Sequence, residues 1–453
     1  MKKIFLFSAI AAFALGFSSC ASEQEDIFGA SAAERMDQAV SDYDARLKDS
    51  EGGWVMEYLP DFGQDLELIA VRFNKDGSCT MGMRTEETGY AYREDVSLWQ
   101  IIADNGPVLS FNTYNKCLHT YATPDPNYIS ATGVYDGDGY GYEGDYEFNV
   151  INCEDNAEYV MLKGKKRGTY TRMTRLEPGT NFETYLQDLI DFKTNTFGEF
   201  APNFIILEMG DAKYKIEGIY NTQCNIYPYD GDALADASYW PFLITKHNGK
   251  YYLRFHDDFT ASNDKVAREF AFDEATMQFV DVKDADCKIM GPSAEDVSSI
   301  FERSLYNGDT WRWNRKSTMS DSFKSLVDAV YAGITAYGSN YTMDDSHNID
   351  FSLNSEKTKA MISLNYKSGR ANTKVQYLYN VSFEGGKMKL TYDTHVNTNA
   401  KTFYTKIPSV QAFVDALGTD FEACATVIGG FSLSEIQLKD NSGNLWVNAA
   451  FVY

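Results

Sequence analysis

The stretch that decides the fold is residues 69–83, IAVRFNKDGSCTMGM. Large apolar residues recur at every second position on both sides of a polar turn, residues 74–77, that ends in Gly77. Alternation with a period of two is typical of a strand with one buried face, and a glycine after such a turn suits the left-handed position of a hairpin. The stretch therefore predicts two antiparallel strands joined by a tight turn.

The same pattern extends outward along most of the chain. Other strands are predicted at residues 54–58, 98–103, 108–112, 146–150, 159–163, 170–173, 204–208, 214–220, 243–246, 251–255, 349–353, 361–366, 375–383, 388–392, 431–438 and 445–453. Asn248-Gly249 is a further strong hairpin signal, because both residues tolerate positive φ. These patterns predict a mainly β (α+β) protein built from antiparallel meander sheets or lipocalin-like barrels.

Helical patterns interrupt the strands. Capping boxes open predicted helices at Ser31 with Glu34 and at Thr180 with Glu183. Apolar residues at helical spacing predict further helices in 293–305, 323–331 and 409–417, and residues 308–316 are expected to be connecting chain. Because a helix precedes each run of strands, we predict three modules of one helix plus β-sheet, at residues 31–176, 177–310 and 311–453.

Residues 1–19 have the order of a lipoprotein signal peptide: a basic pair, an apolar run and two serines directly before Cys20. The apolar run is too short to cross a bilayer easily, and a plain secretory peptide is the alternative. We expect cleavage before Cys20 and acylation of that residue, so that lipid alone anchors the chain. Residues 20–30 form an acidic tether that resembles the surface-export signal of Bacteroidota lipoproteins, which implies display at the cell surface from the outer membrane.

The chain has 41 basic and 65 acidic residues and a formal net charge of −24, which makes nucleic acid an unfavourable partner. Six cysteines besides Cys20 are widely scattered, without a Cys-x-x-Cys pair. Zinc and thioredoxin-type sites need that close spacing. We therefore expect single buried thiols, with one or two long-range disulfides as the alternative.

Residues 135–145, YDGDGYGYEGD, are the most biased segment. Oxygen ligands for Ca²⁺ could come from Asp136, Asp138, Glu143 and Asp145, although the register of an EF-hand is missing. A Gly-x-Gly-x-x-Gly pattern in the same segment lacks the following helix that a dinucleotide site requires. The sequence predicts no cofactor other than calcium at this loop.

Aromatic residues in Gly/Asp/Asn-rich connections are the candidate ligand contacts, because exposed rings can stack on sugar rings or grip peptide side chains. The alternative is that they plug the barrel ends. The candidates are Tyr135, Tyr140, Tyr142, Tyr239, Trp240, Trp311 and Trp313.

No catalytic motif stands out. The five histidines form no close pair, and the chain lacks a Gly-x-Ser-x-Gly elbow and a P-loop. A glycosidase needs only two suitably spaced carboxylates, but with 65 acidic residues the sequence cannot nominate a pair. We expect no enzymatic activity, with a hydrolase that uses paired carboxylates as the alternative.

Four short motifs resemble a known family. They are Gly53-Trp54 with Tyr58, Pro107 to Asn115 followed by Leu118-His119, Gly144 to Phe148, and Leu162 to Lys166. In combination they resemble Bacteroidota lipoproteins assigned to a domain of unknown function, numbered 4302, over at least the first half of the chain. The resemblance implies a companion of SusC/SusD-type nutrient importers at the outer membrane, and it brings no catalytic residues.

Together these expectations describe a non-catalytic, surface-exposed lipoprotein that binds glycan or peptide as an accessory to a SusC/SusD-type importer. A hydrolase acting on the same polymers and a structural or adhesive surface protein are the alternatives.

Overall fold

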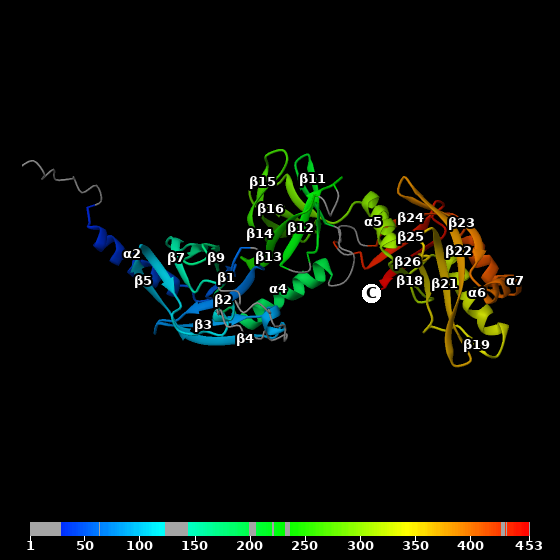
Figure 1. The fold of residues 1–453 in the computed structure, drawn as a ribbon, viewed down its shortest axis with the longest axis horizontal. Helices are drawn as coiled ribbons and strands as arrows, with labels where there is room; N and C mark the ends of the chain where they lie inside the picture. Colours follow the sequence, from blue (N-terminus) through cyan, green and yellow to red (C-terminus); the bar gives the residue numbers. More distant parts are fainter. Residues whose placement is uncertain are drawn as a thin grey trace, which may run out of the picture. The chain divides into compact units, whose positions relative to one another are not determined.

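The computed structural model describes residues 29–62, 64–122, 144–198, 205–219, 222–231, 236–426, 431 and 433–452. Their strands form three antiparallel sheets accompanied by short helices (Figure 1), which confirms the predicted mainly β fold. The chain divides into two compact units: residues up to 63 with residues 68–181, and residues 64–67 with residues 182–453. The first unit contains one sheet and the second contains two.

The first unit holds a nine-stranded sheet in the order β4-β3-β2-β1-β9-β8-β7-β6-β5. Its elements are α2 (Ala32–Lys48), β1 (Trp54–Tyr58), β2 (Glu67–Phe73), β3 (Ser78–Met83), η1 (Glu86–Thr88), β4 (Arg93–Leu98), β5 (Gln100–Asp104), β6 (Gly106–Ser110), α3 (His119–Ala122), β7 (Glu147–Asn152), β8 (Tyr159–Gly164) and β9 (Tyr170–Arg175). β4 and β5 lie at opposite edges although only Trp99 separates them in the chain. The sheet therefore curls until its edges meet, as a nearly closed barrel.

The hairpin predicted at residues 69–83 is confirmed. β2 pairs with β3 from Ile69 opposite Met83 to Phe73 opposite Cys79. Gly77 closes the turn with a φ of +84°, the left-handed conformation that favours glycine. The apolar residues of the alternation are buried, so the pattern identifies the core face.

β1 is more buried than a simple alternation predicts, since all five of its residues are inaccessible. Glu57 is among them, and its carboxylate lies 3.7 Å from the guanidinium of the equally buried Arg172 on β9. A buried charge needs such a partner to offset its desolvation. The polar position in the strand is therefore an internal ion pair and not a solvent-facing one.

The capping box at Ser31 and Glu34 is present and begins α2. Near the other end of the helix, the carbonyl of Leu47 accepts a hydrogen bond of 3.0 Å from the indole of Trp54. Both residues are buried, so this bond ties the end of α2 to β1.

The second unit begins with a closed eight-stranded barrel in which each strand pairs with the next and β17 returns to β10. Its elements are α4 (Phe182–Phe197), β10 (Ile205–Met209), β11 (Ala212–Glu217), β12 (Gln223–Pro228), β13 (Ser238–His247), β14 (Lys250–Thr260), β15 (Val266–Asp273), β16 (Gln278–Asp281) and β17 (Cys287–Met290). Asn248 and Gly249, at φ +50° and +72°, join β13 to β14 as predicted. α4 lies beside this barrel (Figure 1). The ring of its Phe192 stacks on that of Tyr251 in β14, with 3.7 Å between the ring centroids.

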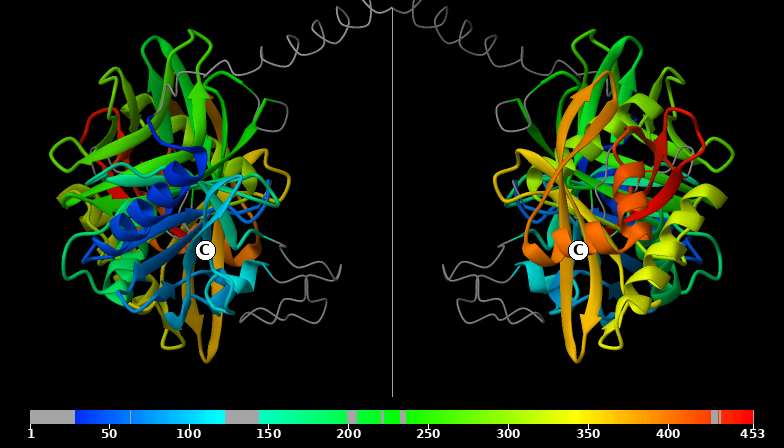
Figure 2. Two further views of the ribbon diagram at one scale, coloured as in Figure 1. Left: turned by 90° about the vertical axis from the view of Figure 1, so that its left-hand side faces the viewer. Right: turned by 90° about the vertical axis from the view of Figure 1, so that its right-hand side faces the viewer.

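The last sheet has nine strands in the order β19-β21-β20-β18-β26-β25-β24-β23-β22. β21 and β22 also pair with each other, so the sheet closes on itself and only β19 lies outside the closed ring of strands. Its elements are α5 (Ala294–Asn307), β18 (Thr310–Trp313), α6 (Asp321–Tyr337), β19 (Tyr341–Thr342), β20 (Ile349–Leu353), β21 (Lys359–Ser368), β22 (Ala371–Glu384), β23 (Lys387–His395), α7 (Thr398–Lys406), α8 (Pro408–Ala416), β24 (Asp420–Ala425), β25 (Glu435–Asp440) and β26 (Trp446–Val452). The tip of the β21–β22 hairpin, gold in Figures 1 and 2, projects past the other strands of this sheet.

One prediction in this region is wrong, and one helix was not predicted. Residues 308–316 contain β18, which pairs with β20 and β26, and are not only connecting chain. The predicted last helix, α8, is preceded by α7, which the sequence pattern did not reveal. α5, expected to belong with the preceding strands, places Val297, Phe301 and Leu305 in the apolar core of the last sheet.

Within the described residues, no helix has the length and apolar character needed to cross a bilayer. The six described cysteines are free thiols, and all except Cys424 are buried. Burial raises the pKa of Cys117 to about 12 and that of Cys153 to about 11. The prediction of single buried thiols is therefore confirmed for five of these six residues, and Cys424 is a half-buried free thiol.

Candidate functional site

Three rings form a short row on the first unit, which we call the aromatic row: Tyr114, His119 and Tyr146. The imidazole of His119 lies between the two phenol rings, with centroid distances of 5.3 Å to each. Tyr114 is 61% exposed and Tyr146 is 43% exposed, whereas His119 is half-buried between them. Single exposed aromatic residues are common on protein surfaces, but here the imidazole packs between two exposed phenol rings, at interplanar angles of 38° and 25°, and the three form an aromatic cluster that a ligand can contact.

Asn115 fixes one end of the aromatic row. Its side chain is fully buried, donates to the hydroxyl of Ser97 at 3.1 Å, and accepts from the amide of Cys117 at 2.9 Å. The backbone amide of Asn115 donates to Nδ1 of His119 at 3.1 Å, and the backbone carbonyl of Asn115 accepts from the backbone amide of His119 at 2.8 Å. These bonds hold the start of α3 against the loop that carries Tyr114.

Asp145 fixes the other end. Its carboxylate accepts hydrogen bonds from the amides of Lys166 and Arg167, at 2.6 and 2.8 Å, in the turn after β8. A Cβ atom on Gly164 would overlap this carboxylate, so only glycine leaves room for it. The carbonyl of the next residue, Tyr146, accepts from the amide of Phe111 at 3.0 Å. The motifs around residues 107–119, 144–148 and 162–166 therefore meet in one structure that supports the aromatic row.

The imidazole of His119 is held in its neutral form. Burial lowers the pKa of His119, because a charged ring loses its hydration there. The amide hydrogen bond to Nδ1 also requires an unprotonated nitrogen at that position. A neutral ring between two tyrosines keeps the aromatic row apolar at neutral pH.

Most candidates of the acidic loop lie in residues 123–143, outside the described residues; they are Tyr135, Tyr140, Tyr142, Asp136, Asp138 and Glu143. The described residues on both sides of that segment carry rings of the aromatic row. His119 lies before it, in α3, and Tyr146 lies after it. Asp145 is described, and its carboxylate is occupied by the two backbone amides. Among the described residues, no group of three potential metal ligands occurs, and calcium at the loop stays a prediction.

Tyr239 and Trp240 lie on strand β13, not in a connection. Tyr239 is 59% exposed, while the indole of Trp240 packs edge-on to Phe259 with 5.0 Å between ring centroids. Tyr239 is therefore accessible to a ligand, and Trp240 is partly committed to its neighbours.

The expectation that Trp311 and Trp313 sit in a connection and offer exposed faces is wrong. Both lie on β18 and are only 0% and 2% exposed. The alternation of this short strand directs both indoles into the core and Arg312 to the other face. Trp311 also donates to the hydroxyl of Ser304 at 3.1 Å. The alternative of core packing therefore holds for this pair.

Sequence reasoning did not nominate Tyr114, His119 or Tyr146 as ligand contacts, although it used the motifs that contain them. The available signal was the occurrence of these rings at both ends of a tyrosine-rich, glycine-rich segment. Their mutual stacking depends on the curl of the sheet, which no local pattern encodes.

The fold and the aromatic row define a mainly β, antiparallel-barrel protein with an exposed aromatic surface. The chain belongs to the family described as a domain of unknown function, DUF4302, whose model matches residues 24–280. The aromatic row lies inside this matched region. No curated protein sequence matches the chain.

Among solved structures, the chain has distant similarity to the DNA polymerase III β subunit of Thermotoga maritima, with 8% identity, coverage of 92% of this chain and 97% of that one, and a TM-score of 0.13. It is also distantly similar to isotype 1 transferrin binding protein B of serogroup B Neisseria meningitidis, with 8% identity, coverage of 90% and 73%, and a TM-score of 0.15. TM-scores this low do not indicate a common fold, so neither structure informs the function.

Proposed function

We propose that this protein binds glycans at the cell surface without transforming them, as a lipid-anchored accessory to a SusC/SusD-type nutrient importer. The aromatic row of Tyr114, His119 and Tyr146 carries the proposal. Its two exposed tyrosines offer aromatic surface against which the C–H faces of sugar rings can pack.

A glycan suits this surface better than a peptide does. Peptide grooves bind through pockets for individual side chains or through an unpaired strand edge, whereas the aromatic row is an exposed cluster of rings between a loop and the start of β7. Rigid rings also lose little conformational entropy when they are covered. Peptide binding is therefore the second outcome that the experiment must distinguish.

The predicted lipoprotein signal supports the location. Lipid at Cys20, followed by the acidic tether of residues 20–30, would hold the folded units outside the outer membrane of a Bacteroidota cell. Mass spectrometry of the native N-terminus tests this part of the proposal. An unacylated Cys20 would contradict it.

The binding experiment compares the chain with a Tyr114→Ala/Tyr146→Ala variant on a glycan array and by calorimetry with the oligosaccharides that bind. We expect the double variant to bind about tenfold more weakly or worse, since aromatic contacts contribute roughly 0.5–1.5 kcal/mol each. Tyr170→Ala is the matched control, because Tyr170 lies in the same unit and is 44% exposed but is outside the aromatic row. The control should bind like the unaltered chain.

Three results would overturn the proposal. They are an array on which no glycan binds, equal loss of binding in the control, and capture of peptides with no glycan binding. Incubation of each bound oligosaccharide with the chain, followed by product analysis, tests the alternative of a hydrolase. Product that depends on the protein would replace the binding function with catalysis.

A further inference from the structure

A polar groove lies on the last sheet, far in sequence from the aromatic row. It is a cavity of about 480 Å³, within the range of roughly 300–1,000 Å³ that is typical of ligand sites. Three strands and the segment before β20 contribute to its lining, which includes Arg312, Asn348, Asn365, Lys367, Asn372 and Lys374. We call this cavity the polar groove.

Strand register brings these residues together. Asn365 on β21 lies opposite Lys374 on β22, and Lys367 lies opposite Asn372. The two lysines are thus diagonal neighbours across the hairpin, about 7–8 Å apart at the backbone. Apolar residues that alternate with them, such as Leu364 and Val375, are buried in the core, so the polar set occupies the outer face of the sheet.

The acidic group at the base of the groove is already neutralised. Asp350 accepts two hydrogen bonds from the guanidinium of Arg312, at 2.6 and 3.2 Å. Asn365 donates to the same carboxylate at 2.9 Å and to the carbonyl of Asn348 at 2.9 Å. A bidentate arginine pair of this kind fixes both partners. Asp350 therefore contributes order to the groove without leaving an uncompensated negative charge.

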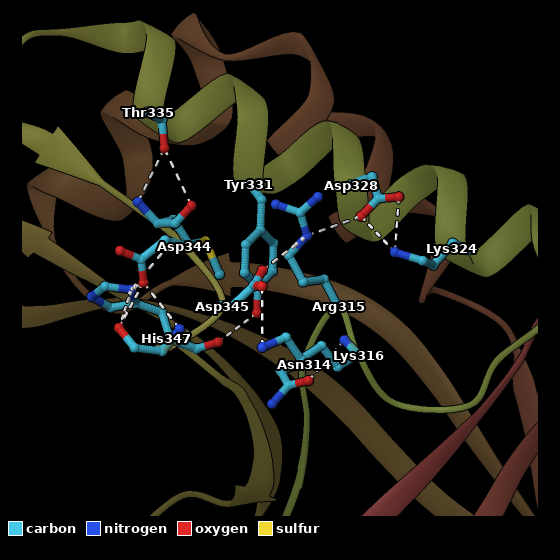
Figure 3. A network of polar contacts seen from close by, with 12 residues as sticks. Asn314, Arg315, Lys316, Lys324, Asp328, Tyr331, Thr335, Asp344, Asp345 and His347 are labelled. Atoms are coloured by element: carbon cyan, nitrogen blue, oxygen red, sulfur yellow. Dashed lines mark hydrogen bonds and ion pairs between the residues drawn. The ribbon is translucent and has the colours of Figure 1, made fainter.

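Ion pairs also fix the adjoining wall (Figure 3), where Asp344 remains a charged carboxylate hydrogen-bonded to Ser346 and His347. Arg315 lies 3.3 Å from Asp345 and 3.5 Å from Asp328 on α6, and Lys316 lies 3.2 Å from Asp345. Tyr331 of α6 donates to the carbonyl of His347 at 2.5 Å. Residues 345–347 are thereby held by α6 and by the two basic residues that follow β18.

Lys367 and Lys374 remain as uncompensated charges. Both side chains are exposed, and neither forms an ion pair with any carboxylate in the part of the chain that the structure describes. Two such cations beside a neutralised base form a locally positive site in a chain of net charge −24. A positive site of this kind attracts anionic ligands.

We propose that the polar groove is a second binding site, specific for an acidic saccharide whose carboxylate or sulfate group is held by Lys367 and Lys374. The amide side chains of Asn348 and Asn372 supply donors and acceptors for sugar hydroxyls, and Asn365, whose two donors are already used, adds its side-chain oxygen as an acceptor. The site is independent of the aromatic row, and it extends the proposed function by naming the charge of a ligand.

The test is calorimetry of the whole chain with three probes: trigalacturonate, a chondroitin sulfate tetrasaccharide and the neutral sugar maltotriose. We expect an acidic probe to bind, a Lys367→Gln/Lys374→Gln variant to bind it at least tenfold more weakly, and 500 mM salt to weaken binding by screening. Lys389→Gln/Lys401→Gln is the matched control. It makes the same change in net charge at two exposed lysines of the same unit and should bind normally.

The two acidic probes separate carboxylate from sulfate recognition, and binding of either one supports the proposal. Equal binding of the acidic probe by the Lys367/Lys374 variant, equal binding of maltotriose in the groove, or binding of no acidic probe overturns it. An acidic peptide that competes with equal affinity also overturns it, because the groove would then recognise charge alone. Loss of binding only in the Tyr114/Tyr146 variant would leave the proposed function standing and remove this inference.

Discussion

His119 links the chemistry of a single residue to the stability of the first unit. Its imidazole is half-buried between two tyrosines and accepts an amide hydrogen bond. Burial lowers the pKa of this histidine in the folded chain, whereas in the unfolded chain it takes up a proton near pH 6.5. Below that pH the unfolded state binds more protons, so falling pH favours unfolding.

The first prediction at this scale follows from that sign. The free energy of unfolding of the unaltered chain should fall relative to that of His119→Gln as the pH decreases from 7.5 to 5. Urea denaturation of both proteins at several pH values measures the difference. A difference that does not change with pH, or that changes in the opposite direction, would show that the imidazole takes up its proton as easily in the folded chain.

At the scale of elements, turn residues and helix caps are the sequence signals that predict the observed structure best. The hairpins at residues 69–83 and 248–249 and the start of α2 were found because their turn residues and caps are adjacent in sequence. β18 was missed because four residues, Thr-Trp-Arg-Trp, form a strand only through pairing with β20 and β26. Its pairing partners include Phe351 and Phe451, and the second of these is 140 positions from Trp311.

The candidate site likewise depends on contacts between residues that are separated in sequence, which a local pattern cannot predict. Asn115 and Asp145 fix the two ends of the aromatic row through bonds to residues 18 to 22 positions away. Sequence could place tyrosines in this region, but the mutual distances of the rings depend on how β6 and β7 pair. The buried indoles of β18 show the converse case, since their aromatic character alone suggested a ligand surface.

The cap of α5 gives a prediction for a single element. Ser293 accepts from the amide of Asp296 at 3.4 Å, and the carboxylate of Asp296 accepts from the amide of Ser293 at 2.7 Å. Ser293→Ala should lower the free energy of unfolding by about 1 kcal/mol. Ser299→Ala, inside the same helix, is the control and should have almost no effect, because alanine favours a helix interior. Equal effects of the two substitutions in urea denaturation would contradict the role of the cap.

At the scale of the whole molecule, each sheet is completed by its terminal strands. β1 pairs with β9, β10 pairs with β17 and β18 pairs with β26. The last of these pairs buries Val447 and Ala449 in the core of the final sheet. The closing strand therefore contributes both a hydrogen-bonded edge and apolar packing.

Val447→Asp tests this closure. A carboxylate in that core has no described partner among the apolar neighbours of Val447, so we expect a loss of about 3–5 kcal/mol. Ala450→Asp, on the exposed face of the same strand, is the control and should change stability by only about 0.5 kcal/mol. Because the first unit has its own core, glycan binding by the aromatic row should survive in both variants. Thermal unfolding together with binding calorimetry measures the two effects.

The late position of β26 also bears on biogenesis. β18 finds its second neighbour only when residues near 450 have been synthesised. A nascent chain that already contains the eight strands β18 to β25 of the final sheet therefore still has an unpaired edge on β18 and another on β25. Such edges invite pairing with other polypeptides. A chaperone that shields them until synthesis is finished would therefore raise the yield of correctly assembled protein.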